Sequence, residues 1–481
     1  MTQSDLIAIL PILVVVGWAL VCLILDLWIP VGRKGITAFL TALGLVAALV
    51  IVVVQRGQTA LAFNGMAVQD GFSMFLDIIF LVSGLAGIAL AVDYLKRMNI
   101  ERGEYYILLM FTVSGMMLMA HANDLIMVFI SLELLSIPLY VLAGFARPRP
   151  ESEEASLKYF LLGTFASAIV LYGVALIFGA TSHTDFKGIL NAVLGSKVNP
   201  VLFLAGSGIL LVGFGFKIAA VPFHMWTPDV YQGAPSPVSG FMSVGAKAAG
   251  FAALLRVFAL IFPSLAVNLT PVLWILAALT MILGNVLAVV QTNIKRLLAY
   301  SSIANAGYIL MAFVPYGQAH VLNDSIASAL FYLSAYAFTS LGAWAVVIAL
   351  ERAEGKGLLL DDYAGLGKKH PWLSLSMMIF MLSFTGVPLT LGFWGKFYLF
   401  RTALEGGYTI LALIGLLTSL VSAYYYLRVV VIMYMRPGDP EVQGGAWINF
   451  TAIAAALAVV GLSFVPGPLF DMAAAAILKL Q

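Results

Sequence analysis

Charged residues are scarce in this chain, and their scarcity excludes a soluble protein. Only 10% of the 481 residues are charged, whereas 62% are hydrophobic. The mean hydropathy is +1.02. Soluble globular domains carry roughly 25% charged residues, so this composition does not suit one. The formal net charge of +2 gives no sign of a nucleic-acid partner.

Cysteine and the usual cofactor motifs are also scarce. The single cysteine, Cys22, excludes a disulfide within the chain. It also excludes an iron–sulfur cluster held by this chain alone, because such clusters need about four thiolates. The five histidines stand singly, and the sequence has no G-x-G-x-x-G or P-loop match. We therefore expect no cofactor, metal site or redox centre in this chain.

Apolar stretches occupy most of the sequence. A helix needs about 20 apolar residues to cross a bilayer, and fourteen stretches approach that length. The first is longer than the apolar part of a cleavable signal, so we expect it to remain as a membrane helix. We predict an all-α polytopic membrane protein of about 14 transmembrane helices, without a separate soluble domain. The predicted spans are 6–29, 36–54, 72–94, 105–121, 124–144, 153–179, 201–226, 236–262, 272–291, 297–315, 322–350, 373–400, 408–435 and 447–477.

The loops between these spans carry an uneven share of Lys and Arg. Loops that follow odd-numbered spans hold fourteen such residues. Because basic loops stay on the cytoplasmic side, the bias predicts that both termini lie on the outer face of a cell membrane. The loops after even-numbered spans and the two termini hold five, namely Arg56, Lys187, Lys197, Arg401 and Lys479.

Three ionisable residues lie close to the middle of predicted spans. A charged side chain at mid-bilayer costs roughly 2.5–3.5 kcal/mol, so such residues serve an ion path or a structural ion pair. Lys217 and Lys247 lie within about 6 Å of the centres of their spans, at 1.5 Å per residue. Glu133 lies at the midpoint of 124–144 and is too short to reach the interface. For all three, position favours a functional role.

Four further basic residues lie inside predicted spans but nearer their ends. A long side chain there can lift its charge to the interface. For Arg256 and Arg428, we favour a structural or interfacial role. Position alone leaves both roles open for Lys158 and Lys396.

Two prolines indicate broken membrane helices. Pro222 interrupts the seventh span in VPFHMW, and Pro388 interrupts the twelfth in VPLTLGFW. Non-helical backbone at membrane depth persists only where protein or a water-filled cavity satisfies its polar groups. A lysine lies near each proline, Lys217 and Lys396 respectively. Two broken helices five spans apart are typical of the inverted repeats of ion transporters.

These motifs resemble a known family. FKIAAVPFHMWTPDVYQGAPSPVSGFMSVGAKAAGFAALLRVF (216–258), IKRLLAYSSIANAGYILM (294–311) and GFWGKFYLF (392–400) are similar to the antiporter-like membrane subunits of complex I, the proton-pumping NADH–quinone oxidoreductase. The segments 149–179 and 422–434 resemble the bacterial subunit N branch of that family. The resemblance covers almost the whole chain.

The resemblance implies a set of proton-carrying residues. It makes Lys217 on the seventh helix the central proton carrier and pairs Glu133 on the fifth helix with Lys158 on the sixth. Lys247 then leads toward the second half-channel, and Lys396 completes the outlet.

The resemblance also implies how the chain is organised. Helices one to four would occupy 1–121, with helix four opening the first inverted five-helix repeat at 105–262. The second repeat would occupy 272–435, and helix 14 would lie in 436–481. Two departures stand beside broken segments: Leu389 follows Pro388 where the family often has a second proline, and Ala246 precedes Lys247 where proline is frequent.

The expected function follows from the same resemblance. The chain would be a non-redox subunit of a bacterial H⁺-translocating translocase in the lipid bilayer, coupled to quinone reduction in respiratory electron transport. Its partners would be the other complex I membrane subunits and, indirectly, the peripheral redox arm. Flavin, iron–sulfur clusters and quinone would belong to those partners. The alternatives are a subunit of a multisubunit cation/proton antiporter or of an energy-converting hydrogenase.

Overall fold

Long apolar helices make up almost all of the chain. The computed structural model describes residues 3–196, 198–353, 355–476 and 478, so Lys197 and Lys479 and the outermost residues of 1–121 and 436–481 lie outside the described residues. Among the described residues, ten helical segments are long and apolar enough to cross a membrane. The other four predicted spans fall on α2 (Leu10–Asp26), α5 (Glu104–His121), α14 (Ile294–Phe313) and the pair α17 (Pro371–Thr385) and α18 (Leu391–Glu405). The count of fourteen and the inverted repeats stay predictions.

The N-terminal part contributes four apolar helices and a short hairpin. Strand β1 pairs antiparallel with β2, with Leu61 opposite Val68. Asp70 caps α4 through a reciprocal pair of hydrogen bonds with Ser73, which explains why that helix begins there. The elements are α1 (Gln3–Ala8), α2 (Leu10–Asp26), α3 (Gly35–Val54), β1 (Ala60–Ala62), η1 (Phe63–Gly65), β2 (Ala67–Gln69), α4 (Gly71–Arg97) and α5 (Glu104–His121).

The next part holds the first broken helix. Segment η2 is a π-helical stretch that leads into α12, and it stands where the sequence has Ala246 in place of the family's frequent proline. The elements are α6 (Leu125–Ala143), α7 (Pro150–Thr181), α8 (Phe186–Leu194), α9 (Pro200–Ile218), α10 (Trp226–Gly233), α11 (Ser236–Phe241), η2 (Met242–Ala246), α12 (Lys247–Ile261) and η3 (Pro263–Leu265).

The C-terminal half holds the second broken helix. Between α15 and α17 the chain forms two short helical turns, within the predicted loop 351–372. The elements are α13 (Ala266–Val289), α14 (Ile294–Phe313), α15 (Leu322–Leu350), η4 (Leu360–Tyr363), α16 (Leu366–Lys369), α17 (Pro371–Thr385), α18 (Leu391–Glu405), α19 (Thr409–Met435), α20 (Ala446–Phe464) and α21 (Pro466–Ala474).

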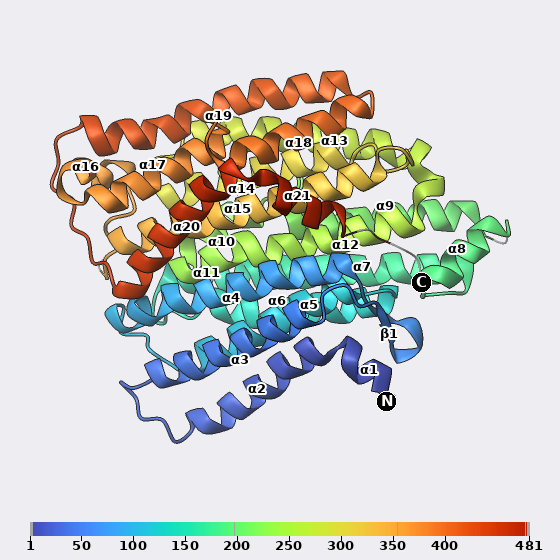
Figure 1. Cartoon of the computed structure of the whole chain (residues 1–481), viewed down its shortest axis with the longest axis horizontal. Coiled ribbons are helices and arrows are strands. Elements are labelled where there is room, and N and C mark those ends of the chain that lie inside the picture. The colour runs from blue at the N-terminus through green and yellow to red at the C-terminus, as the bar shows by residue number, and fades with distance from the viewer. Residues whose placement is uncertain (1–2, 197, 354, 477, 479–481) are drawn as a thin grey trace.

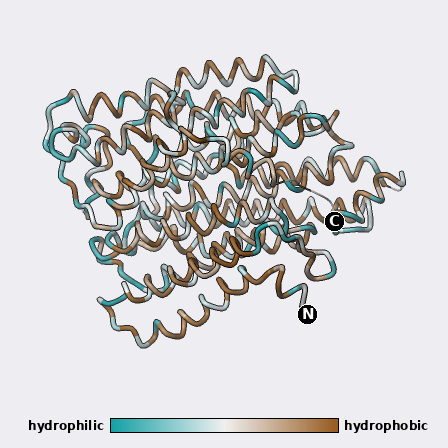
Figure 2. Tube along the Cα trace, in the orientation of Figure 1, coloured by the Kyte–Doolittle hydropathy of each residue, from teal (hydrophilic) through white to brown (hydrophobic). Residues whose placement is uncertain are grey.

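The helices run roughly side by side across the molecule. Figure 1 shows α16 at one end of the bundle, on the left, and β1 and α8 at the other end, on the right. Apolar residues follow the helices, and polar residues gather at their ends and in the connecting loops (Figure 2). This distribution is the one that a bilayer imposes on a bundle of spanning helices.

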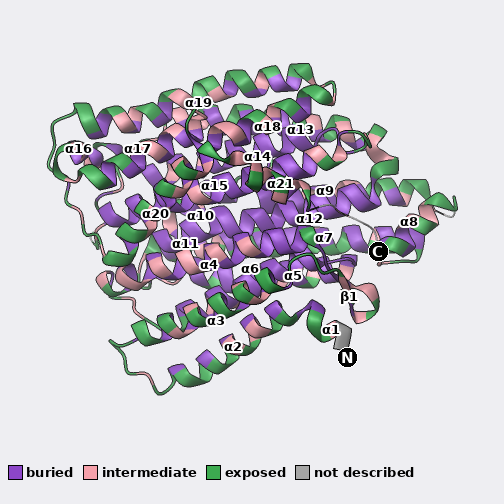
Figure 3. Cartoon of the chain, viewed as in Figure 1, coloured by how far each residue is buried: buried purple, intermediate pink, exposed green. Residues whose placement is uncertain are grey.

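Burial separates a central group of helices from a peripheral one. The most apolar windows of Ser236–Ile261 and α15 are 100% and 94% buried, whereas those of α3, α19 and α20 are 39% or less buried. In Figure 3 the exposed residues follow α2, α3 and α19 at the edges. The exposed faces of these helices are apolar, as a lipid-facing surface requires.

Both predicted helix breaks are confirmed. Helix α9 ends at Ile218 and is followed by Ala219, whose φ of 61° is left-handed, and α10 begins only at Trp226. Protein groups satisfy the interrupted backbone. The Val221 amide donates a hydrogen bond to Thr280 Oγ1 at 2.9 Å, and the Phe216 carbonyl accepts a hydrogen bond from Trp226 Nε1 at 3.0 Å. These contacts are what an irregular backbone needs at membrane depth.

The second break has the same form. Helix α17 ends at Thr385 and is followed by Gly386, which is left-handed with a φ of 88°, and α18 begins at Leu391. A Cβ at Gly386 would lie 2.9 Å from Cδ of Lys396. The glycine therefore serves both the turn and the close passage of the lysine stem.

Candidate functional site

Lys217 lies on the last turn of α9, immediately before the first helix break. The residue is 6% exposed. Its Nζ donates to Ser136 Oγ at 2.7 Å and to Tyr159 OH at 3.4 Å, and it lies 5.7 Å from the Tyr159 ring centroid. The amine therefore sits against two hydroxyls and an aromatic face, and its hydrogen bonds reach no carboxylate among the described residues.

Glu133 acts on this amine from a distance. It lies three residues before Ser136 on α6, and helical residues three apart are neighbours on one face. Its carboxylate interacts electrostatically with Lys217. Glu133 Oε1 is buried and has no hydrogen-bond partner among the described groups. No hydrogen bond to this oxygen therefore fixes the carboxylate in place.

The expected pairing of Glu133 with Lys158 is not found. The Lys158 ammonium instead binds Asp229 at 2.8 Å and Glu154 at 2.7 Å. Its side chain is 41% exposed, and both of its ion-pair partners are acidic residues other than Glu133. The reason is geometric, because α10 places Asp229 next to α7 in a way that neither helix reveals alone.

Asp229 joins two basic side chains. Besides Lys158, it accepts a hydrogen bond from Arg296 Nη1 at 2.7 Å. Partial burial raises the pKa of Asp229, but the hydrogen bonds from Lys158 and Arg296 outweigh it and leave the pKa below its ordinary value. Asp229 therefore stays ionised and holds the two cations together.

These three residues line a charged cavity of about 570 Å³. The cavity lies where α7, α10 and α14 meet the loop after α15. Lys295 also lines it, is 2% exposed, and donates from Nζ to the Ala234 carbonyl at 2.7 Å. Lys295 falls in the loop between the predicted spans 272–291 and 297–315, whereas the structure places it in a buried polar site.

Lys247 begins α12, directly after the π-helical segment η2. It is 3% exposed, and its Nζ donates to the carbonyl of Ser302 on α14. The same helix packs closely on Lys217, because a Cβ at Gly250 would lie 3.2 Å from Lys217 Cγ. Helix α12 therefore carries one lysine and contacts the stem of the other.

Lys396 lies on α18, after the second break, and is 5% exposed. Its Nζ donates to Thr385 O at 3.0 Å and to Ser419 Oγ at 2.7 Å. The ammonium also lies 4.9 Å from the centroid of the Tyr308 ring. Its partners are again neutral oxygens and an aromatic face.

Polar side chains of α14 lie between Lys247 and Lys396. Asn305 Nδ2 donates to Ser301 O at 2.8 Å, and Asn305 Oδ1 accepts from Tyr332 OH. Ser301 bonds the hydroxyl of Tyr426, while Tyr308 faces Lys396. These residues are not among the site residues expected from the sequence, although Ser301, Asn305 and Tyr308 stand at i, i+4 and i+7. That spacing on a spanning helix is a signal for one polar face.

The hydrogen-bond partners of Arg256 and Arg428 show whether these two arginines are structural or interfacial. Arg256 is 1% exposed and holds Asp70 through two hydrogen bonds of 2.9 and 2.8 Å, so it does not reach an interface. Arg428 donates to the carbonyls of Val289, at 3.0 Å, and Gln291. Arg428 therefore caps the end of α13, and both arginines are structural.

The lysines and the helix breaks together define a class of protein. Broken spanning helices with buried ionisable side chains are the architecture of ion-transporting membrane proteins. Among the described residues, no three His, Cys, Asp or Glu side chains cluster as a metal site would require.

Comparisons with known proteins identify the family. Residues 122–422 match the family model "NADH:quinone oxidoreductase/Mrp antiporter, TM". The NADH-quinone oxidoreductase subunit N of Trichlorobacter lovleyi is 47% identical over 461 residues, which cover 95% of this chain and 92% of that protein. The chain therefore belongs to the NADH-quinone oxidoreductase subunit N branch of this antiporter-like family.

Solved structures agree with this assignment. A chain of respiratory complex I from Thermus thermophilus is 35% identical and superposes with a TM-score of 0.82, covering 97% of this chain and 100% of that one. A chain of the Mrp complex from Dietzia sp. DQ12-45-1b superposes with a TM-score of 0.87, covering 99% of this chain and 97% of that one. At 20% identity, the Mrp likeness concerns the fold alone. The antiporter alternative therefore has less support than the subunit N assignment.

Proposed function

We propose that this subunit moves protons along Lys217, Lys247 and Lys396, with Glu133 and Lys158 controlling the first of them. One observation carries the proposal. Each of the three lysines is buried, and within the described part of the chain each amine donates only to hydroxyl or carbonyl oxygens. A buried ammonium without a bound carboxylate is costly, so such a site favours exchange between charged and neutral amine.

A buried lysine in a purely structural role looks different in the same chain. The side chain of Lys34 is 11% exposed, and its Nζ lies 2.8 Å from Asp26 Oδ2. A direct carboxylate partner holds the proton on its lysine. Hydroxyls such as that of Ser136 accept from an ammonium and donate to a neutral amine, so they serve both states of Lys217.

Glu133 supplies the control. A unit charge pair at 4 Å is worth about 4 kcal/mol at an effective dielectric near 20, and this falls as the distance grows. Movement of the Glu133 carboxylate by a few ångströms therefore changes the stability of the charged amine by an amount sufficient to bind or release a proton. Lys158 and Arg296 hold Asp229 beside the same helices and would transmit displacements of α10.

The proton movement would be driven from outside this chain. We propose that the subunit works within a NADH-quinone oxidoreductase, alongside its other membrane subunits and, indirectly, a peripheral redox arm. Flavin, iron–sulfur clusters and quinone would act in those partners. The subunit would lie in the cell membrane of a bacterium with both termini on the outer face. The bias of Lys and Arg between its loops supports this orientation.

The test separates charge from proton release at Lys217. Lys217→Arg keeps a cation that does not release its proton, whereas Lys217→Met removes the cation. We expect the arginine variant to assemble and pump poorly, and the methionine variant to lose pumping. Quinone reduction and proton uptake are measured in membrane vesicles and normalised to assembled complex.

Lys34→Arg is the matched control for this experiment. Lys34 is another buried lysine, but its proton is held by a carboxylate, so the change to arginine should leave pumping intact. Wild-type pumping by Lys217→Arg would rule out a titrating lysine at that site.

A further inference from the structure

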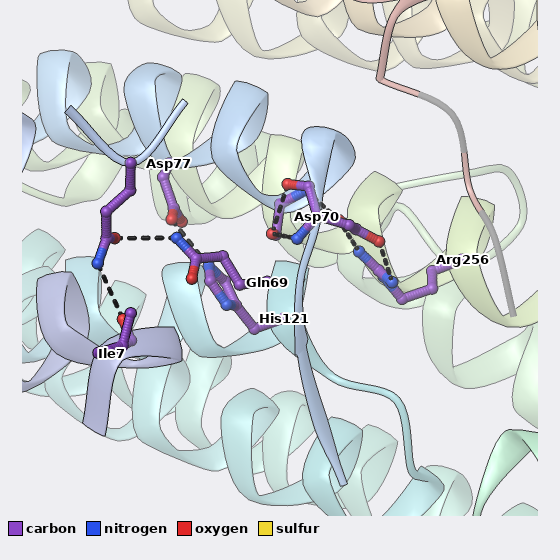
Figure 4. A network of polar contacts seen from close by, with 8 residues as sticks. Ile7, Gln69, Asp70, Asp77, His121 and Arg256 are labelled. Carbon is purple, nitrogen blue, oxygen red and sulfur yellow. Dashed lines mark hydrogen bonds and ion pairs between the residues drawn. The ribbon is translucent and has the colours of Figure 1, made fainter. Parts of the chain in front are cut away.

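A buried acid–base pair lies away from the lysines. Asp77 is in the second turn of α4, and His121 is the last residue of α5. Asp77 Oδ2 and His121 Nε2 are 2.8 Å apart, and both side chains are 1% exposed. Figure 4 shows the two side chains facing each other at the end of the helices, near the polar residues of the hairpin.

The remaining polar atoms of this pair are unpartnered. Asp77 Oδ1 and His121 Nδ1 are buried and have no hydrogen-bond partner among the described residues, and the same holds for Gln69 Oε1 beside them. Buried polar atoms are nearly always satisfied, by protein groups or by water. Three unpartnered atoms around one histidine–aspartate pair therefore mark a polar site, not a closed structural contact.

A chain of amides leads from this site toward the end of the bundle. Gln69 Nε2 donates to Gln55 Oε1 at 2.9 Å, and Gln55 Nε2 donates to Ile7 O at 2.9 Å. On the other side, Asp70 caps α4 and binds Arg256 of α12, the helix that begins at Lys247 (Figure 4). The pair thus lies between the polar end of the bundle and a helix of the lysine site.

Charges from three elements act on Asp77. His121 belongs to α5, Asp70 precedes α4, and Arg256 belongs to α12. Arg256 and Asp70 compensate each other through their two hydrogen bonds. The imidazole is therefore the partner that Asp77 contacts directly, at 2.8 Å.

We propose that Asp77 and His121 form a proton-binding site separate from the Lys217–Lys247–Lys396 series. In the resting form, one proton lies between Asp77 Oδ2 and His121 Nε2, and Nδ1 holds a lone pair. A proton delivered by water binds Nδ1 and forms an imidazolium paired with the aspartate. Return of that proton to water restores the resting form, so proton and charge balance. Histidine is suited to this exchange because it titrates near neutral pH.

The proposal is tested on the resting complex in its membrane. We would record infrared difference spectra between pH about 5 and 8, the range in which histidine titrates. His121→Gln keeps an amide donor for Asp77 but does not titrate. It should remove an imidazole band that the wild type shows. Asp77→Asn should displace that band along the pH axis, because the ring loses its counter-charge.

The matched control is a similar pair at the surface. His183 Nδ1 lies 3.4 Å from Asp185 Oδ1, and both side chains are 49% exposed. His183→Gln should leave the His121 band in place. If His121→Gln gives the same difference spectrum as the wild type, the proposal is overturned. If that variant does not assemble, an unchanged band in Asp77→Asn overturns it equally.

The measurement needs no electron flow. It is therefore independent of the pumping assay on Lys217, and either idea can fail while the other stands.

Discussion

Replacement of Arg256 should show what a buried, carboxylate-paired cation contributes. Arg256→Ala leaves Asp70, which is 3% exposed, without its partner. Removing one member of a buried ion pair costs about 3–5 kcal/mol, because the other charge remains desolvated. Arg256→Lys keeps the charge but loses the bidentate hydrogen bonding to Asp70. The loss of one charged hydrogen bond costs about 1.5–3 kcal/mol.

The assay is the fraction of complex assembled in membranes, together with the midpoint of thermal denaturation in detergent. Alanine should reduce both strongly and lysine should reduce both less. Asp70→Asn should keep the cap of α4, since asparagine caps as well as aspartate, yet leave Arg256 unpaired. The double variant Asp70→Asn with Arg256→Met should lose less stability than the sum of the losses in the two single variants.

An exposed ion pair provides the control. Arg401 lies 2.7 Å from Glu405 one helical turn away, with side chains 53% and 38% exposed. Exposed pairs of this kind contribute at most about 0.5 kcal/mol, so Arg401→Ala should barely change assembly. If Arg256→Ala were no more harmful than Arg401→Ala, the reasoning about the buried pair would be refuted.

Three further predictions follow from other contacts. Gly250→Ala would place a Cβ 3.2 Å from Lys217 Cγ, and such overpacking costs about 1–3 kcal/mol. Proton uptake per assembled complex should fall, and wild-type uptake would show that the stem can move aside. A cysteine at exposed Gln58, beside β1, should react with an impermeant thiol reagent from outside, whereas one at exposed Lys368 in α16 should not. The reverse labelling pattern would show that the predicted orientation is wrong. Because the pKa of Asp229 is lowered, its ionised contacts stabilise the fold above its unfolded pKa of about 3.9 and are lost as pH falls through the lower folded value. Asp229→Asn should therefore lower the denaturation midpoint at pH 7, and equal midpoints there would contradict this.

The amino-acid sequence alone determined the membrane architecture. Apolar stretches of about 20 residues predict spanning helices because a bilayer leaves unpaired backbone groups no partner. The two breaks were predicted because Pro222 and Pro388 each remove a backbone donor from a span and each lie near a lysine. Proline alone does not break a span, since Pro138 lies inside α6 and Pro271 inside α13. Lys217, Lys247 and Lys396 also stood out, because a cation in an apolar run is costly wherever it packs.

The partners of these charges were decided only by the tertiary structure. Lys158 was expected beside Glu133, yet it binds Asp229, which lies 71 residues away in the chain. The position of Arg256 fits a structural or an interfacial role, and its pairing with Asp70, 186 residues away, makes it structural. Periodicity along one helix shows which side of it is polar. It does not show which other helix faces that side, because this depends on how all the helices pack together.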